Sequence, residues 1–315
     1  MSTDAVHSAA NPAWGQVIRA QSGFYTVRMS GGQNVVCRLR GRLKKMHRQG
    51  DVVAVGDWVR VTLLPDGSGV IEAVAPRQRA LERRAPTARG TYQQVLLANP
   101  DQLVLVFACA QPEPRLRMLD RFLVIAEKQQ IPVLIVANKV DLVGLERAQE
   151  IFSIYPPLGY PVLYTSAKTG YGIEDLKAHL IGRLSALAGP SGVGKSSLLN
   201  AIQPELGLAV GSVREKGGKG RHTTVVRQLF PLDGGGYVAD MPGLRTLALW
   251  DTQPEELDGY FPEIRDLVAL CQFNDCTHTN EPGCAVREAV AQGKIHPQRY
   301  ESYLRLRAGE EEESD

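Results

Sequence analysis

The sequence predicts an α/β protein with an N-terminal OB-like β-barrel and a small helical C-terminal part. Three observations lead to this expectation. Short alternating strands separated by turns fill residues 14–75, nearly continuous apolar strands alternate with helical patterns from residue 101, and the strands stop near Trp250. Because 315 residues exceed what one hydrophobic core usually holds, we expect several domains.

The composition is that of a globular protein without membrane-spanning segments. Hydrophobic residues make up 43% of the chain and charged residues 22%, and the longest apolar runs are too short to cross a bilayer. The first residues lack the basic start and the long apolar stretch of a secretion signal. We therefore expect a cytoplasmic protein that does not bind membranes. We also expect a monomer.

The N-terminal strands fit a barrel domain over residues 1–80. About five strands within about sixty residues, with glycine and proline–aspartate turns between them, are typical of an OB fold. Such barrels often bind nucleic acid but also serve as neutral scaffolds. Two basic clusters, Cys37–Arg48 and Arg77–Arg89, agree with a nucleic-acid partner, although most basic runs are only solvated surfaces. The basic stretch 81–94 is expected to be a linker.

An α/β domain is expected over residues 95–250. The apolar runs 101–110 and 131–142 bracket a helical pattern at 115–129, which is how parallel strands buried on both faces alternate with covering helices. The alternation continues to residue 189. From residue 251 to 315 we expect a small helical domain that ends in an acidic tail.

A phosphate-binding loop follows the last of these strands. Its sequence GPSGVGKS matches G-x-x-x-x-G-K-[ST] and precedes a helix, a context in which backbone N–H groups and the helix N-terminus bind phosphates. Lys195 would reach the β and γ phosphates, and the Ser196 hydroxyl would bind Mg²⁺. A glycine-rich strand-to-helix turn is the alternative. The residues expected around the phosphates are Gly189, Pro190, Ser191, Gly192, Val193, Gly194, Lys195, Ser196 and Ser197.

The base-reading residues lie earlier in the chain. Asn138, Lys139 and Asp141 end one strand, and the Asp141 carboxylate can accept hydrogen bonds from the N1 and N2 donors of guanine, which adenine does not offer. The next strand ends in Ser166, Ala167 and Lys168, similar to the loop that backs guanine in GTPases. Either motif alone, NKVD at 138–141 or TSAK at 165–168, could be a turn, but together they predict a guanine site.

Two further elements follow the phosphate loop. Asp240 ends a strand and would hold Mg²⁺ through water, while the Gly243 N–H would sense the γ-phosphate. Thr223 or Thr224 in GRHTT could close over Mg²⁺, although a plain basic loop is an alternative. Base-reading motifs thus precede phosphate-reading motifs, which predicts a circularly permuted P-loop GTPase domain. Strand ends at one edge of a sheet can form one site in any chain order.

The C-terminal part contains a candidate structural zinc site. Cys271, Cys276, His278 and Cys284 supply four ligands in the spacing C-x4-C-x-H-x5-C, and four protein ligands leave no open position for catalysis. Unliganded buried cysteines beside a surface histidine are the alternative. Cys37 and Cys109 are expected to be ordinary buried residues.

The combination of NKVD, SAK, GPSGVGKS, GRHTT, DMPG and CTHTNEPGC resembles the RsgA (YjeQ) family of circularly permuted GTPases over about residues 14–307. The resemblance implies a late assembly factor that binds the immature small ribosomal subunit. It further implies GTP hydrolysis to GDP and phosphate that the subunit stimulates and that is linked to release. The barrel and the zinc domain would both contact ribosomal RNA.

Two positions depart from common patterns. The family commonly has threonine where Met241 stands, and Leu244 occupies the place of the water-orienting glutamine of many GTPases. We therefore expect slow intrinsic GTP hydrolysis. His222, another loop or the ribosome would supply the polar group that orients water. Alternatively, His222 is a switch residue that only faces solvent. Leu244 also keeps open a GTP-switched RNA-binding module with incidental hydrolysis. A P-loop small-molecule kinase fits less well, because Asp141 and Asp240–Gly243 favour a GTPase.

Overall fold

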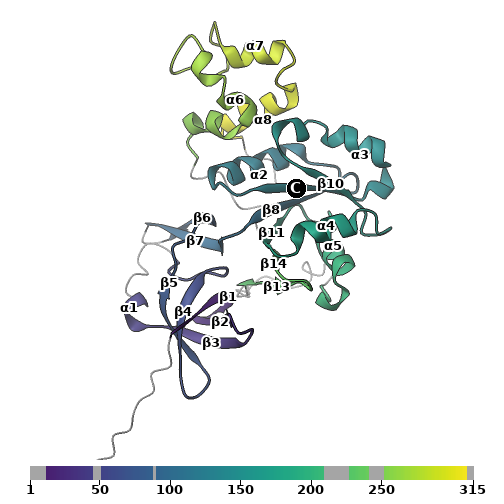
Figure 1. The fold of residues 1–315 in the computed structure, drawn as a ribbon. Helices are drawn as coiled ribbons and strands as arrows, with labels where there is room; N and C mark the ends of the chain where they lie inside the picture. Colours follow the sequence, from purple (N-terminus) through teal and green to yellow (C-terminus); the bar gives the residue numbers. More distant parts are fainter. Residues whose placement is uncertain (1–11, 45–50, 88–89, 209–226, 241–251, 311–315) are drawn as a thin grey trace, which may run out of the picture. The chain divides into compact units, whose positions relative to one another are not determined.

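The computed structural model describes residues 12–44, 51–87, 90–208, 227–240 and 252–310. The chain divides into two units (Figure 1). The first contains Met1–Pro100 and Gly218–Pro231, and the second contains Asp101–Gly217 and Leu232–Asp315. No helix among the described residues combines the length and the apolar character needed to cross a membrane.

The predicted barrel is confirmed in the first unit. Strands run in the order β1–β2–β3–β5–β4, and β4 pairs again with β1, which closes the sheet. Valines, Ile71 and the buried Cys37 fill the interior, where a Cβ at Gly15 or Gly69 would come within 2.7 Å of neighbouring atoms. The elements are β1 (Ala13–Gln21), β2 (Phe24–Met29), β3 (Asn34–Leu39), α1 (Gly41–Lys44), β4 (Trp58–Leu63) and β5 (Gly69–Val74).

The stretch 81–94, expected to be a linker, instead forms most of a β-hairpin. Strand β6 (Ala80–Thr87) pairs antiparallel with β7 (Gly90–Ala98). The base of the hairpin buries Leu81 and Leu97 completely, while polar pairs such as Arg83 and Gln94 bridge the strands farther out. Strand β12 (Arg227–Gln228) also belongs to this unit and pairs with β1, an addition that the sequence did not predict.

The second unit is built around the expected parallel sheet. Strands β8 (Gln102–Ala108), β9 (Val133–Asn138), β10 (Val162–Thr165), β11 (Leu184–Ala188) and β14 (Tyr237–Asp240) lie in the order β10–β9–β8–β11–β14. The short strand β13 (Phe230–Pro231) precedes β14. Because all five sheet strands are parallel, their carboxyl ends meet at one edge.

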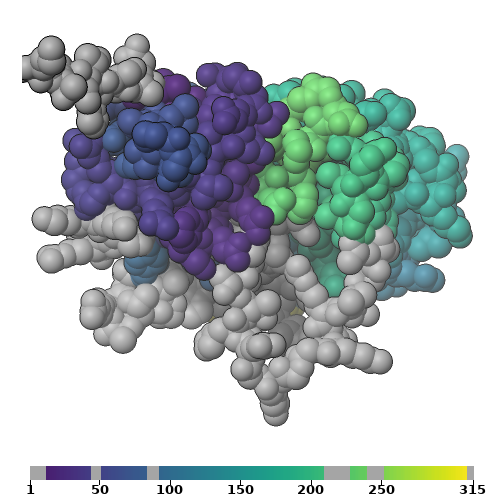
Figure 2. Space-filling view, turned by 90° about the horizontal axis from the view of Figure 1, so that it is seen from below, coloured from purple at the N-terminus to yellow at the C-terminus, as the bar shows by residue number. Residues whose placement is uncertain are grey.

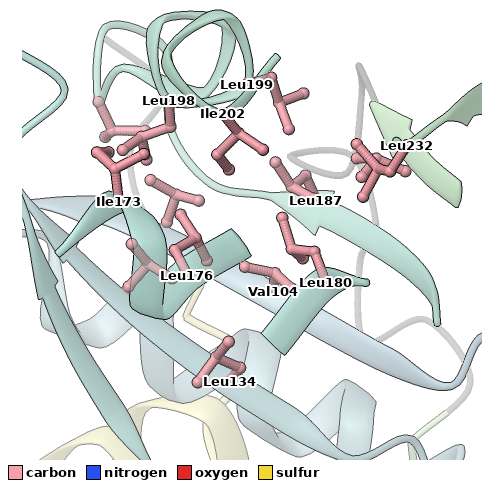
Figure 3. Packing of buried hydrophobic residues seen from close by; sticks show 14 of the residues in the cluster. Val104, Leu134, Ile173, Leu176, Leu180, Leu187, Leu198, Leu199, Ile202 and Leu232 are labelled. Atoms are coloured by element: carbon pink, nitrogen blue, oxygen red, sulfur yellow. The ribbon is translucent and has the colours of Figure 1, made fainter. Parts of the chain in front are cut away.

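Helices cover both faces of this sheet (Figure 1). Helices α4 (Ile173–Leu180) and α5 (Lys195–Ile202) pack on Val104, Leu134 and Leu187, as Figure 3 shows. On the other face, Phe122 of α2 (Leu116–Lys128) meets Phe107 edge to face with ring centroids 6.3 Å apart. Helix α3 (Leu145–Phe152) lies on the same side as α2.

The helical C-terminal domain belongs to the second unit. Its elements are η6 (Pro254–Tyr260), α6 (Pro262–Arg265), η7 (Val268–Leu270), α7 (Ala285–Ala291) and α8 (Pro297–Arg307). Its core includes Val124 of α2, so the two parts share buried surface. The fully buried Arg299 of α8 contacts Asp120 of α2 and Glu263 of α6, each at 2.6 Å. This ion network joins the C-terminal domain to the sheet domain.

Candidate nucleotide and metal sites

Asn138 connects the segments that were expected to bind the base and the phosphates. It ends β9, and only 1% of its surface is exposed. Its Nδ2 donates a hydrogen bond to the Val193 carbonyl at 2.8 Å, and its Oδ1 accepts hydrogen bonds from the Thr165 hydroxyl at 3.2 Å and the Ala167 N–H at 3.3 Å. Three segments expected at one site therefore meet around one amide. Sequence reasoning did not select Thr165, although it directly precedes the SAK motif.

Lys139 lies along the phosphate loop. Its backbone adopts the left-handed conformation, with φ of 66°, at the start of the short helix η1 (Val140–Leu142). Its Nζ donates to the Gly192 carbonyl at 2.7 Å and to the Gln111 carbonyl. Gln111, which sequence reasoning also missed, follows β8 and carries no motif signal. The lysine thus holds the loop between two strand ends.

Asp141 is exposed and oriented by a buried neighbour. The Ser166 hydroxyl, which has no exposed surface, donates to Asp141 Oδ1 at 2.6 Å. The same Ser166 oxygen accepts from the Thr169 N–H at 3.2 Å, while Lys168 is exposed beside it. This arrangement fixes the direction of a carboxylate whose remaining lone pairs are free to accept hydrogen bonds.

The phosphate loop depends on close backbone packing. Gly189 and Gly194 have φ of 143° and 98°, and a Cβ would lie 2.0 Å from the Val106 carbonyl oxygen at Gly189 and 2.5 Å from Asn138 Nδ2 at Gly194. Larger residues would push the loop away from the strand ends. Lys195 begins α5, and its Nζ donates to the carbonyls of Gly189 and Pro190, both at 2.8 Å. Ser196 and Ser197 lie in the first turn of α5.

Asp240 reaches the same sheet edge from later in the chain. It ends β14, and its backbone is in register with Leu187 of β11, just before the phosphate loop. The other residues expected around Mg²⁺ and the γ-phosphate lie outside the described residues. These are His222, Thr223, Thr224 and Gly243, and the two atypical positions Met241 and Leu244 also lie outside the described residues.

The expected metal ligands form a single cluster. The ligand atoms of Cys271, Cys276, His278 and Cys284 all lie within 4.8 Å of one another. His278 Nδ1 lies 3.5 Å from Cys271 Sγ and 3.4 Å from Cys284 Sγ. Zn–S bonds of about 2.3 Å in a tetrahedron put ligand atoms about 4 Å apart, so the cluster fits zinc. Burial raises the pKa of the Cys276 thiol to about 12, whereas a bound metal would favour the thiolate.

Residues that sequence reasoning did not select hold the metal loop. The Glu281 carboxylate accepts hydrogen bonds from the N–H groups of Thr277 and Thr279, both at 2.9 Å, and from the Thr277 hydroxyl. These bonds, led by the Thr277 hydroxyl, lower the pKa of Glu281 to about 2. The Asp258 carboxylate lies 3.7 Å from His278 Nε2, on the side of the ring away from the thiols. A carboxylate there can orient a metal-bound imidazole.

Comparisons with known proteins find close likenesses over nearly the whole chain. A model described as RsgA GTPase matches residues 74–250, and one described as RsgA N-terminal domain matches residues 14–71. The small ribosomal subunit biogenesis GTPase RsgA of Gemmatimonas aurantiaca is 46% identical, covering 93% of this chain and 96% of that protein. The protein of the same name from Thermotoga maritima is 44% identical, covering 93% of this chain and 95% of that protein.

Solved structures show the same likeness. The crystal structure of YjeQ from Thermotoga maritima matches with a TM-score of 0.79 and 41% identity, covering 95% of this chain and 98% of that one. The structure of YloQ, described as a circularly permuted GTPase, matches with a TM-score of 0.74 and 33% identity, covering 96% of each chain. Together with the barrel topology, these likenesses confirm the predicted fold class.

Proposed function

Because the chain belongs to the RsgA GTPase family, we propose that it hydrolyses GTP to GDP and phosphate during late maturation of the small ribosomal subunit. The subunit stimulates hydrolysis, and hydrolysis releases the protein from it. The observation that supports the proposal best is the hydrogen bond from Asn138 to the Val193 carbonyl, which joins the base-reading strand end to the phosphate loop. That contact supports a single binding site in which the base and the phosphates of one nucleotide lie at the same sheet edge.

Guanine would be selected by Asp141. The carboxylate, oriented by Ser166, can accept two hydrogen bonds from guanine, and adenine would leave it without those partners. Asn138, Lys139, Ala167 and Lys168 would frame the same base from two strand ends. Selectivity for GTP over ATP thus rests on a carboxylate held in place before nucleotide arrives.

The triphosphate would bind on the phosphate loop. Lys195 would exchange the carbonyls of Gly189 and Pro190 for the β and γ phosphates, while backbone N–H groups at the start of α5 face the negative charge. Mg²⁺ would neutralise charge on the phosphates, with Ser196, Asp240 and Thr223 or Thr224 as its proposed partners. Gly243 would sense the γ-phosphate, and His222 or a group of the ribosome would position water in place of the missing glutamine.

The zinc cluster would serve structure. Four protein ligands close a tetrahedral site, so no position is open for substrate. We propose that zinc folds the C-terminal domain, and that this domain and the barrel contact ribosomal RNA of the small subunit. The protein would act as a monomer in the cytoplasm.

Phosphate release over many turnovers, with and without small subunits, tests the proposal. We expect a clear subunit-dependent increase in wild-type protein and its loss in Lys195→Ala. Asp141→Asn should keep the fold but lose preference for GTP over ATP in competition binding, because an amide cannot accept both guanine donors. No increase with subunits would contradict the enzyme proposal and favour the second candidate, a GTP-switched RNA-binding module, which Leu244 supports.

A further inference from the structure

The outer surface of the barrel exposes two tryptophans on neighbouring strands. Trp14 of β1 and Trp58 of β4 are 45% and 46% exposed. In the β1–β4 pairing, Trp14 lies opposite Arg60, and Gln16 lies opposite Trp58. Since Val17 and Val59 point into the core, these alternate residues all point outward. Directly opposed side chains of such pairs are in reach of one another.

Arg60 on this surface is not paired with a carboxylate in the described part of the chain. Arg77, which follows the barrel strands, bonds to Asp57 at 2.8 Å. By contrast, Arg60 Nε is buried and has no hydrogen-bond partner among the described residues. The residue is half-buried as a whole, so its exposed area lies on other atoms, and a guanidinium without a carboxylate partner suits an anionic ligand. The position of Arg60 between Trp14 and Trp58 indicates a ligand with both negative charge and flat apolar surface.

The charge of the surrounding strands selects the ligand class. Strands β1, β2 and β4 contain no acidic residue but carry Arg19, Arg28 and Arg60. Arg28 lies opposite Gln16 and is exposed, so it extends the same surface. We call the surface formed by Trp14, Gln16, Arg28, Trp58 and Arg60 the Trp–Arg face. Figure 2 shows part of the barrel exterior in purple.

We propose that the Trp–Arg face binds a single-stranded segment of RNA. Unpaired bases stack on Trp14 and Trp58, and Arg28 and Arg60 contact the phosphates. Stacking on exposed aromatic rings beside arginines is how single strands bind without sequence preference, whereas the bases of a duplex are not available for it. This inference rests on the proposed function for RNA as the partner and adds where and in which form RNA binds.

Tryptophan fluorescence offers a direct test in the full-length protein. The chain has three tryptophans, so a Trp250→Phe background leaves only the two on the face. Titration with a short oligouridine should quench their emission, and a duplex of equal length should bind much more weakly at the same salt concentration. Trp14→Ala and Trp58→Ala are made separately in the otherwise unchanged wild-type chain, and binding is followed by the anisotropy of a labelled oligouridine. Each substitution should weaken binding between about fivefold and a hundredfold.

Matched variants separate stacking from loss of fold or charge. Trp14→Phe and Trp58→Phe keep an aromatic ring and should retain most affinity, and Arg60→Lys should weaken binding because it keeps charge but loses the planar group. Leu145→Ala, an exposed apolar residue on α3, should change nothing. Thermal unfolding checks that the barrel of each variant is intact.

Three outcomes would overturn the inference. The first is equal binding of single-stranded and duplex RNA, and the second is unchanged affinity for oligouridine in both alanine variants. The third is a wild-type protein that does not bind oligouridine while the alanine variants lose small-subunit binding, which would indicate a protein partner. The proposed function fails separately. It is contradicted if wild-type GTPase activity does not respond to small subunits, whereas a stimulated wild type with unaffected tryptophan variants contradicts only the Trp–Arg face.

Discussion

The proposed nucleotide site and the proposed metal site of the second unit are built in opposite ways. The nucleotide site gathers residues from strand ends that are far apart in sequence, such as Asn138, Ser166 and Lys195. The metal site takes all four ligands from one loop between Cys271 and Cys284 that contains no described helix or strand. The first site needs a completed sheet, while the second needs an ion to fix its loop.

This difference predicts how each site responds to damage. The sheet beneath the nucleotide site has a continuous apolar core (Figure 3), so its strand ends stay in place without a ligand. A few hydrogen bonds hold the metal loop. The Glu281 carboxylate accepts from the Thr277 N–H, and the Tyr303 hydroxyl of α8 donates to the Thr277 carbonyl at 3.1 Å. Removal of the metal should therefore have a large, local effect on stability, whereas removal of the nucleotide should have a small effect.

Removal of a metal ligand should have the largest effect. We expect Cys284→Ser to abolish zinc binding and unfold the C-terminal domain, because structural zinc contributes on the order of 10 kcal/mol in small domains. GDP affinity should change little. Hydrogen exchange of α7 and α8 together with zinc content and GDP binding checks this. Cys37→Ala, at a buried cysteine of the barrel, should keep its zinc. Equal loss of nucleotide binding would contradict separate sites.

The ion network between α2 and α8 should have the next largest effect. Arg299→Met leaves the buried Asp120 without its cation, which should cost about 3–5 kcal/mol of unfolding free energy. Burial already raises the pKa of Asp120 against the pull of Arg299, so without Arg299 its pKa lies still higher. A raised folded-state pKa means that stability falls as pH rises, and the loss should be larger at pH 8 than at pH 5.

Denaturant unfolding of the full chain measures this loss. The matched control is Arg305→Met, since Arg305 pairs with Glu301 on the surface at 3.0 Å and should contribute less than about 1 kcal/mol. Asp120→Asn keeps hydrogen-bonding atoms but removes the charge, and it should abolish the pH dependence seen in Arg299→Met when the two are combined. A loss that does not vary with pH would contradict the assignment.

Local sequence patterns predicted the strands and the motif residues, but not the side chains that contact and support them. Apolar runs such as 131–138 predict a buried parallel strand, because burial on both faces requires apolar residues at successive positions. The β6–β7 hairpin was missed because only its base is apolar and its cross-strand pairs are polar, as at Arg83 and Gln94. Arg299 and Asp120 lie 179 residues apart, and no periodicity specifies such a pair.

Asn138 tests whether the nucleotide site is as preformed as the comparison implies. Asn138→Ala leaves the Val193 carbonyl, the Thr165 hydroxyl and the Ala167 N–H without this partner, which should cost about 1–3 kcal/mol of stability. GDP affinity should fall by a similar free energy. Asn200→Ala is the control, because Asn200 bonds Leu208 at both amide atoms away from the site. It should lower stability but leave GDP affinity unchanged.

Glu281 should show the smallest effect and sharpens the metal side of the comparison. Glu281→Gln should weaken zinc binding about tenfold, as removal of groups around metal ligands commonly does, measured by competition with a chelator. The folded-state pKa of about 2 lies below the ordinary value of 4.5. Its stabilisation is therefore complete above pH 4.5 and is lost as pH falls toward 2. The difference in unfolding free energy between wild type and variant should stay constant from pH 8 to 5, and a change within that range would contradict the role given to this carboxylate.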